Sequence, residues 1–127
     1  MHNLFLGIFV IIIALFSNNP IPDALTTAFK KGDANQISNF FGNSVDLTIP
    51  ENEGVYSKIQ AKLILKTFFL KNQPSDFKVL HNGDSKNSSH YCIGSLKTNK
   101  GNYRTYLLYN QKDGNITILE LKIESDE

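Results

Sequence analysis

The sequence has few of the residues that metal and disulfide chemistry require. Cys92 is the only cysteine among the 127 residues, so an intramolecular disulfide and a cysteine-based metal site are both excluded. The three histidines are far apart in the sequence, and no HExxH motif occurs. Metal catalysis therefore has no sequence signal, and we expect neither a metal nor another cofactor.

The sequence also lacks an excess of charge. Its 13 Lys and Arg residues against 12 Asp and Glu give a formal net charge of +1, and no basic cluster is interleaved with aromatic residues. Proteins that bind nucleic acid usually carry such a basic patch, so we expect no nucleic acid partner. The length and the 41% apolar content are those of one globular domain.

The longest apolar run, Leu4 to Phe16, lies at the N-terminus. It has the length of a signal-peptide core and is shorter than the roughly 20 residues that span a membrane. Ser17 follows it and is small enough for a cleavage site. We predict a Sec signal peptide over residues 1–19 and one domain over residues 20–127. The mature protein is then periplasmic or secreted, with no membrane contact after cleavage. An uncleaved anchor is the alternative.

Val55 to Asn72 is predicted to be the longest helix, around which the chain is organised. Ser57 and Gln60 have the spacing of a capping box. Two apolar stripes follow at helical spacing: Ala61, Ile64, Leu65, Phe68 and Phe69 form the first, and Tyr56, Ile59, Leu63 and Leu70 form the second. A surface helix normally has one stripe, so we expect this helix to lie between two layers.

Between the stripes runs a row of lysines, Lys58, Lys62 and Lys66. Such a row is typical of a solvated face, and an anion-binding strip is the alternative.

Two short helices are predicted before the first strand. One covers Pro20 to Lys31 and stops at Gly32. Asp33 has the position of a cap for the second, which buries Ile37, Phe40 and Phe41 and ends at Gly42.

The remaining elements are predicted strands. Alternating or apolar segments give five: Val45 to Ile49, Phe77 to His81, His90 to Thr98, Tyr103 to Gln111, and Ile116 to Ile123. Glu51 to Gly54 is predicted to be a polar turn, and Asp113-Gly114 is a strong hairpin signal. Segregated helices and strands indicate an α+β domain with an antiparallel sheet.

The later strands carry apolar residues on both faces. Tyr106 and Leu108 alternate with Leu107 and Tyr109 in one strand. In the last strand, one face is predicted to carry Leu119, Leu121 and Ile123, and the other Ile116 and Ile118. Only one face can cover the long helix, so we expect a second subunit to cover the other and predict a homodimer joined through the sheet.

Three polar residues are candidates for ligand binding: His81, Arg104 and Tyr106. We expect His81 to share a face with Phe77 and Val79, where it serves as an acid, base or ligand contact, or only as a structural hydrogen-bonding group. Arg104 and Tyr106 share one strand face and can recognise an anionic or aromatic ligand. The alternative for Arg104 is a cross-strand pair with Glu120, which the pattern favours.

Three further residues have structural interpretations. His90 begins a strand and is expected to be a strand-end histidine. Cys92 has no cation beside it in sequence and is predicted to be a buried apolar residue. Asp46 alternates with Val45 and Leu47, which predicts that it is exposed and argues against catalysis. No catalytic residue is predicted.

Several stretches resemble a known family. AFKKGD (Ala28 to Asp33), GVYSKIQA (Gly54 to Ala61), FKVLHNG (Phe77 to Gly83), YCIGSL (Tyr91 to Leu96) and the pair Tyr103-Arg104 are similar to DUF4783, a family of small exported Bacteroidetes proteins. The resemblance implies an NTF2-like (cystatin-like) roll, in which a curved antiparallel sheet wraps around one long helix beside a short helical hairpin. It implies no activity.

Two functional hypotheses follow. The first is an exported non-catalytic module that binds a small ligand or a protein partner. The second is an NTF2-like enzyme that performs acid–base chemistry on a small molecule inside the cone. Titratable groups that converge on one cavity would favour the enzyme, whereas an interior filled by Phe and Leu would favour the binding module.

Overall fold

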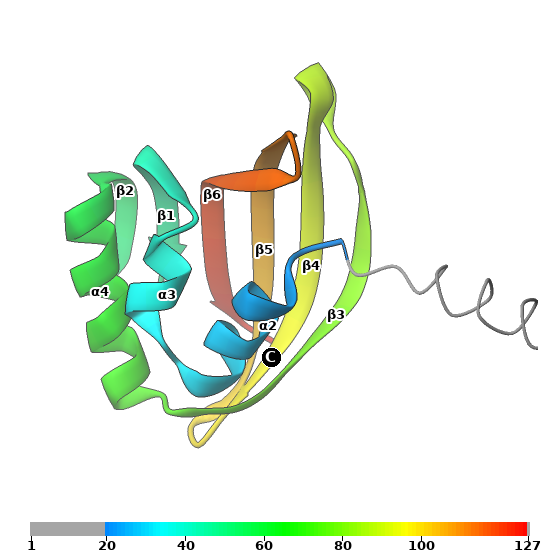
Figure 1. Cartoon of the computed structure of the whole chain (residues 1–127). Helices are drawn as coiled ribbons and strands as arrows, with labels where there is room; N and C mark the ends of the chain where they lie inside the picture. The colour runs from blue at the N-terminus through cyan, green and yellow to red at the C-terminus, as the bar shows by residue number, and fades with distance from the viewer. Residues whose placement is uncertain (1–19, 127) are drawn as a thin grey trace, which may run out of the picture.

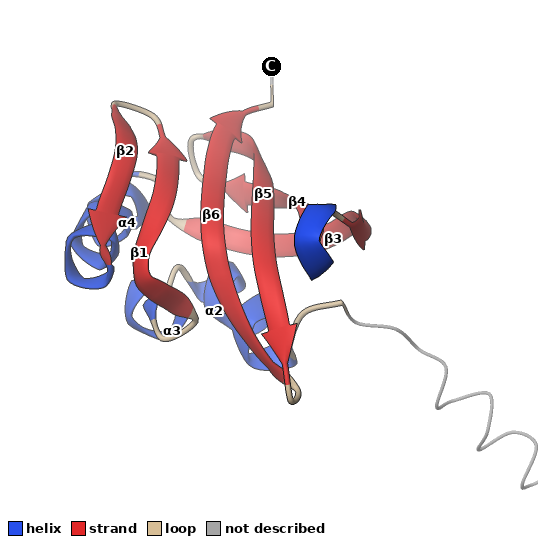
Figure 2. Cartoon of the chain, turned by 90° about the horizontal axis from the view of Figure 1, so that it is seen from above, coloured by secondary structure: helices blue, strands red, loops and turns tan. Residues whose placement is uncertain are grey.

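The computed structural model describes residues 20–126, so the predicted signal peptide over residues 1–19 lies outside the described residues. Six strands form one curved sheet, and the α-helices lie on one face of it (Figures 1 and 2). The strand order across the sheet is β2 (Asn52–Ser57), β1 (Phe41–Ile49), β6 (Asn115–Ser125), β5 (Gly101–Lys112), β4 (Ser89–Thr98) and β3 (Pro74–Asp84). The predicted α+β fold is confirmed. Among the described helices, none has the length and apolar character needed to cross a membrane.

Two short helices begin the domain. α2 (Asp23–Lys31) buries Leu25, Ala28 and Phe29 and ends at Gly32, whose φ of 66° is left-handed. A side chain at this position would also collide with Pro74, because a Cβ there would lie 2.8 Å from the proline Cδ. Asp33 caps α3 (Ala34–Ser38) by accepting a hydrogen bond of 3.1 Å from the Gln36 backbone N–H. The predicted stop of the first helix at Gly32 is confirmed.

The second helix is shorter than the sequence predicted. It ends at Ser38, and Phe41 and Gly42 belong to β1 (Phe41–Ile49). The Ile118 backbone N–H donates to the Phe40 carbonyl at 2.7 Å, and Phe41 lies in register with Ile118 in the sheet. Helical periodicity predicts that these residues extend the helix. They join the sheet instead, because they pair with a strand that is distant in the sequence.

The long helix, α4 (Lys58–Lys71), begins at the predicted cap. Ser57 and Gln60 form both halves of the capping box. The residues before the cap form β2 (Asn52–Ser57), which pairs antiparallel with β1. The predictions that Val55 to Ser57 are helical and that Glu51 to Gly54 form a turn are therefore wrong, since the β1–β2 connection turns at Pro50 and Glu51.

α4 covers the sheet with only one of its two apolar stripes. Ala61, Leu65, Phe68 and Phe69 are buried. In the second stripe, Ile59, Leu63 and Leu70 are exposed, whereas Tyr56 lies in β2 and is half-buried. The prediction that α4 lies between two layers is therefore wrong within the described chain. The helix ends where the Tyr103 hydroxyl donates a 2.8 Å hydrogen bond to Asn72 Oδ1.

After α4 the chain forms the predicted four-stranded meander: β3 (Pro74–Asp84), β4 (Ser89–Thr98), β5 (Gly101–Lys112) and β6 (Asn115–Ser125), with the short 3-10 helix η1 (Lys86–Ser88) between β3 and β4. Asp113 and Gly114 both have positive φ, as a tight hairpin turn requires. All neighbouring strands are antiparallel except β1 and β6, which are parallel.

A β-bulge in β6 changes which residues face the helices. Ile118 lies opposite Tyr109 and Glu120 lies opposite Leu108, so Leu119 is an extra residue. Ile116 and Ile118 are therefore buried on the same face as Leu121 and Ile123. The prediction that Leu121 and Ile123 face away from Ile116 and Ile118 is wrong, because strict alternation does not pass through a bulge.

Apolar side chains from the sheet and the helices occupy the space between them. Phe29 of α2 stacks on Phe77 of β3 with ring centroids 4.8 Å apart. The fully buried side chains include Leu47, Leu107, Leu121 and Ile123 from the sheet and Leu25, Ile37 and Leu65 from the helices. These side chains occupy the concave side of the curved sheet, which is the interior of the predicted cone.

Candidate functional site

His81 lies on the outer face of the sheet, away from the helices. Val79 pairs with Gly94, whereas His81 pairs with Ile93, so Leu80 is an extra residue in β3. The bulge turns His81 to the face opposite Phe77, and the prediction that these residues share a face is wrong. His81 is exposed and does not enter the interior.

Four side chains from four neighbouring strands form a row on this outer face. The Tyr91 hydroxyl oxygen lies 3.0 Å from His81 Nε2. The Tyr91 and Tyr106 rings are stacked with centroids 6.4 Å apart, and Lys122 Nζ lies 5.9 Å from the centroid of Tyr106. The structure therefore brings two of the predicted residues, His81 and Tyr106, into one group.

Gly83 fixes the position of Tyr91. The two residues pair across β3 and β4, and a Cβ on Gly83 would lie 2.8 Å from the Tyr91 ring. The ring therefore lies against the glycine backbone. Tyr91 and Lys122 were missed as site residues because the sequence gives no cross-strand register. The sequence did contain one indication. Tyr91 is next to Cys92 in a strand, so a buried Cys92 places Tyr91 on the outer face.

Arg104 shares the outer face with Tyr106, as predicted, but it does not pair with Glu120. In the sheet it lies opposite Glu124 of β6, and Glu120 lies opposite Leu108. The Lys122 amino group lies 3.6 Å from the Glu120 carboxylate instead. Arg104 and Glu120 belong to neighbouring strands, but the register sets them four residues apart along β6.

His90 lies on the inner face of the sheet, near the start of β4. Its Nδ1 lies 2.9 Å from Asp84 Oδ1, and its ring centroid lies 5.6 Å from that of Tyr109. The Tyr109 hydroxyl donates a 3.0 Å hydrogen bond to the Pro20 carbonyl. His90 is thus a strand-end residue with structural partners, on the opposite face from His81. Asp46 is exposed, as predicted.

Cys92 lies inside the cone and is buried, as predicted. Desolvation raises the pKa of its thiol from 9.0 to about 11. Burial also raises the pKa of Tyr109, with smaller contributions from Cys92 and Asp84. Both groups therefore stay protonated at neutral pH and provide no base or thiolate nucleophile.

We expect the raised thiol pKa to make stability fall at alkaline pH. Below pH 9 the thiol is protonated in both the folded and the unfolded chain. Between pH 9 and about 11 the unfolded chain loses this proton first, so the free energy of unfolding decreases as pH rises. Urea melts at pH 8 and pH 10 would measure this decrease, and Cys92→Ala should reduce it. An equal decrease in both proteins would contradict the assignment.

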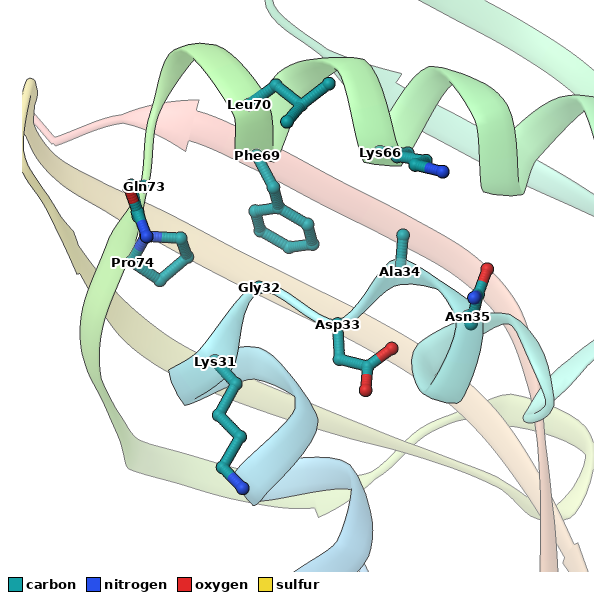
Figure 3. Close-up of a pocket in the computed structure, with 10 residues that line it drawn as sticks. All are labelled: Lys31, Gly32, Asp33, Ala34, Asn35, Lys66, Phe69, Leu70, Gln73 and Pro74. Atoms are coloured by element: carbon teal, nitrogen blue, oxygen red, sulfur yellow. The ribbon is translucent and has the colours of Figure 1, made fainter.

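A pocket of about 430 Å³ lies where the α2–α3 hinge meets the end of α4 (Figure 3). Phe69 and Pro74 form its apolar part, and Lys66 and Leu70 border it from α4. Asp33 also lines the pocket, but its carboxylate is used to cap α3. In residues 20–126, no group of three or more His, Cys, Asp or Glu side chains is placed to hold a metal ion.

The comparisons with known proteins agree with this fold. The model of the family described as a domain of unknown function (DUF4783) matches residues 22–124. The crystal structure of a DUF4783 family protein from Bacteroides ovatus is 29% identical, with a TM-score of 0.76 over 87% of this chain and 99% of that chain. Another, from Bacteroides fragilis, is 30% identical, with a TM-score of 0.74 over 83% and 98%.

A more distant structure shows the fold alone. A domain with a cystatin-like fold from Nostoc punctiforme is 9% identical, with a TM-score of 0.64 over 82% of this chain and 72% of that chain. Among curated proteins, none is significantly similar to this chain. The motifs quoted from the sequence thus identified the correct family. The chain belongs to the DUF4783 family and has the NTF2-like (cystatin-like) roll.

Proposed function

We propose that this domain is an exported, non-catalytic binding module that self-associates through the outer face of its sheet. The observation that carries the proposal is the contrast between the two faces of the sheet. The inner face is occupied by apolar side chains. The outer face presents four half-buried aromatic or aliphatic side chains, which we name the outer patch: Tyr91, Ile93, Tyr106 and Leu108.

The chemistry of the interior favours binding over acid–base catalysis. An enzyme of this shape needs titratable groups that converge inside the cone. Cys92 and Tyr109 lie there, and both have raised pKa values. His81 and His90 lie on opposite faces and have Tyr91 and Asp84 as their partners. These contacts give both histidines a structural role that requires no catalytic reaction.

The outer patch has the composition of a protein interface. Its centre is aromatic and aliphatic, and its border carries Lys122, Glu120 and Arg104, so it resembles an apolar core with a polar rim. Lys122 and Glu120 have opposite charges, which a two-fold axis can pair between subunits. A stable interface buries roughly 800 Å² per subunit.

Export is part of the same proposal. It is supported by the apolar run Leu4 to Phe16 and the small Ser17 that follows. We expect the mature chain to begin near Ser17 to Pro20.

Native mass spectrometry of the protein isolated from the cells that make it would test the proposal. The expected mass is that of two chains that each lack residues up to about Ser17 to Pro20. Ile93→Lys should give a folded monomer, because a buried unpaired charge costs about 3–5 kcal/mol and weakens the dimer by roughly 100-fold or more.

Thr117→Lys is the matched control, since Thr117 is exposed on the same face outside the outer patch. It should remain a dimer. A wild-type monomer at micromolar concentration, or an Ile93→Lys variant that remains a dimer, would refute self-association. An intact Met1 would refute the cleaved signal.

A further inference from the structure

α4 presents an uncovered apolar stripe to solvent. Ile59, Leu63 and Leu70, which we name the outer stripe, are 65%, 56% and 78% exposed. They are four and seven residues apart, so they lie in one line along the helix. The line is about 16 Å long at 1.5 Å per residue, or three helical turns. Leu65 and Phe68 already anchor α4 on the sheet, so the outer stripe has no role in packing within the domain.

The charged side chains that α4 itself carries are all positive. α4 carries four lysines, Lys58, Lys62, Lys66 and Lys71, and no carboxylate. The rest of the chain then holds 9 basic and 12 acidic residues, since the totals are 13 and 12. The helix therefore has a formal charge of +4, and the rest of the chain has a formal charge of −3. The Lys71–Glu51 contact of 4.0 Å is between exposed side chains, so it neutralises this charge only weakly.

The outer stripe continues into the pocket of Figure 3. Leu70 and Lys66 belong to α4 and also line the pocket, whose opposite wall is the Gly32 to Asn35 segment. With a volume of about 430 Å³, the pocket can receive a large side chain from a partner. An apolar line that ends in a pocket is the shape that an amphipathic helix fills.

We propose that the outer face of α4 binds an acidic amphipathic helix of another protein. Aliphatic side chains of the partner pack on the outer stripe, one of them enters the pocket, and its carboxylates face Lys62 and Lys66. A second copy of α4 does not fit this surface, because it would set four lysines against four lysines. A flat lipid surface would contact the outer stripe but would leave the pocket empty. The site is separate from the outer patch on the sheet.

Site-specific photo-crosslinking would test the proposal. The full chain, with p-benzoylphenylalanine in place of Leu63, is expressed in the cells that make it, irradiated, and the adduct is mapped by mass spectrometry. The expected adduct lies in a segment of another protein with aliphatic residues at helical spacing and an excess of Asp and Glu. Lys62→Glu with Lys66→Glu should reduce its yield at least about tenfold, since like charges disfavour the complex.

The matched control reverses two exposed lysines far from α4, Lys86→Glu with Lys112→Glu, and should leave the yield unchanged. Circular dichroism of each purified variant checks that it is folded. An adduct to a second copy of this chain, an adduct to lipid, no adduct, or a yield unaffected by reversal at Lys62 and Lys66 would each overturn the proposal.

Discussion

Replacing Leu65 with Ala is expected to lower the free energy of unfolding by about 2–5 kcal/mol. Leu65 is fully buried at the centre of the buried apolar stripe of α4, between Ala61 and Phe68. Its removal leaves a cavity among side chains that the sheet and α3 hold in place, so the site can collapse only partly. Phe68→Ala should cost a similar amount, because Phe68 is 5% exposed and packs edge-on against Tyr103 with ring centroids 5.2 Å apart.

Urea melts of matched variants would measure this effect. Leu63→Ala makes the same chemical change two residues away on the exposed face and should cost less than about 1 kcal/mol. Lys62→Ala should stay within about 0.5 kcal/mol, as expected of a surface substitution. If all four variants lost similar stability, the assignment of the two faces of α4 would be wrong.

The second large effect is expected at Gly94. Replacing a strand glycine with Ala usually gains about 0.5–1 kcal/mol through the unfolded chain. Here a Cβ would lie 2.5 Å from the Phe77 ring and 3.0 Å from the Lys78 carbonyl oxygen. Phe77 is stacked on Phe29 and buried, so its ring has little room to move. We therefore expect Gly94→Ala to destabilise the protein by about 1–3 kcal/mol, as other overpacked cores do.

A double-mutant cycle would identify the cause. Phe77→Leu removes part of the ring that meets the new methyl group, so the double variant should lose less stability than the sum of the single losses, by about 0.5–3 kcal/mol. Ser95→Ala, at the next position, is the control, because it places Ala in the same strand without adding a Cβ. Full stability of Gly94→Ala would show that the Phe77 ring does not lie over residue 94.

The sequence predicted elements well where local signals decide them. The capping box of Ser57 and Gln60, the left-handed Gly32 and the Asp113-Gly114 hairpin depend on backbone chemistry within four residues, and all three are present. β2 was missed because Val55 and Tyr56 continue the helical spacing of the residues after them. Their pairing with Asp46 and Val45 of β1 is a tertiary interaction, and it overrides that periodicity.

The candidate site was predicted less well, for a physical reason that two leucines illustrate. Leu80 and Leu119 are extra residues in β3 and β6, and each reverses the alternation that follows it. His81 thereby moves to the outer face, and Leu121 and Ile123 move to the inner face beside Ile118. Arg104 faces Glu124 rather than Glu120 because of the overall register between β5 and β6. The row from His81 to Lys122 depends on the register of four strands, which a single sequence does not contain.

The parallel pair of β1 and β6 has a consequence for how the chain is completed during synthesis. β6 lies between β1 and β5 in the sheet, yet it is the last of these six strands to be synthesised. The β1–β2 hairpin, made first, has no sheet neighbour on its β1 side until residues 115–125 have been added. A strand that comes last in chain order is one that we would expect at an edge of the sheet, but β6 joins its two halves. Proteolytic removal of residues 115–125 would therefore divide the sheet rather than shorten it.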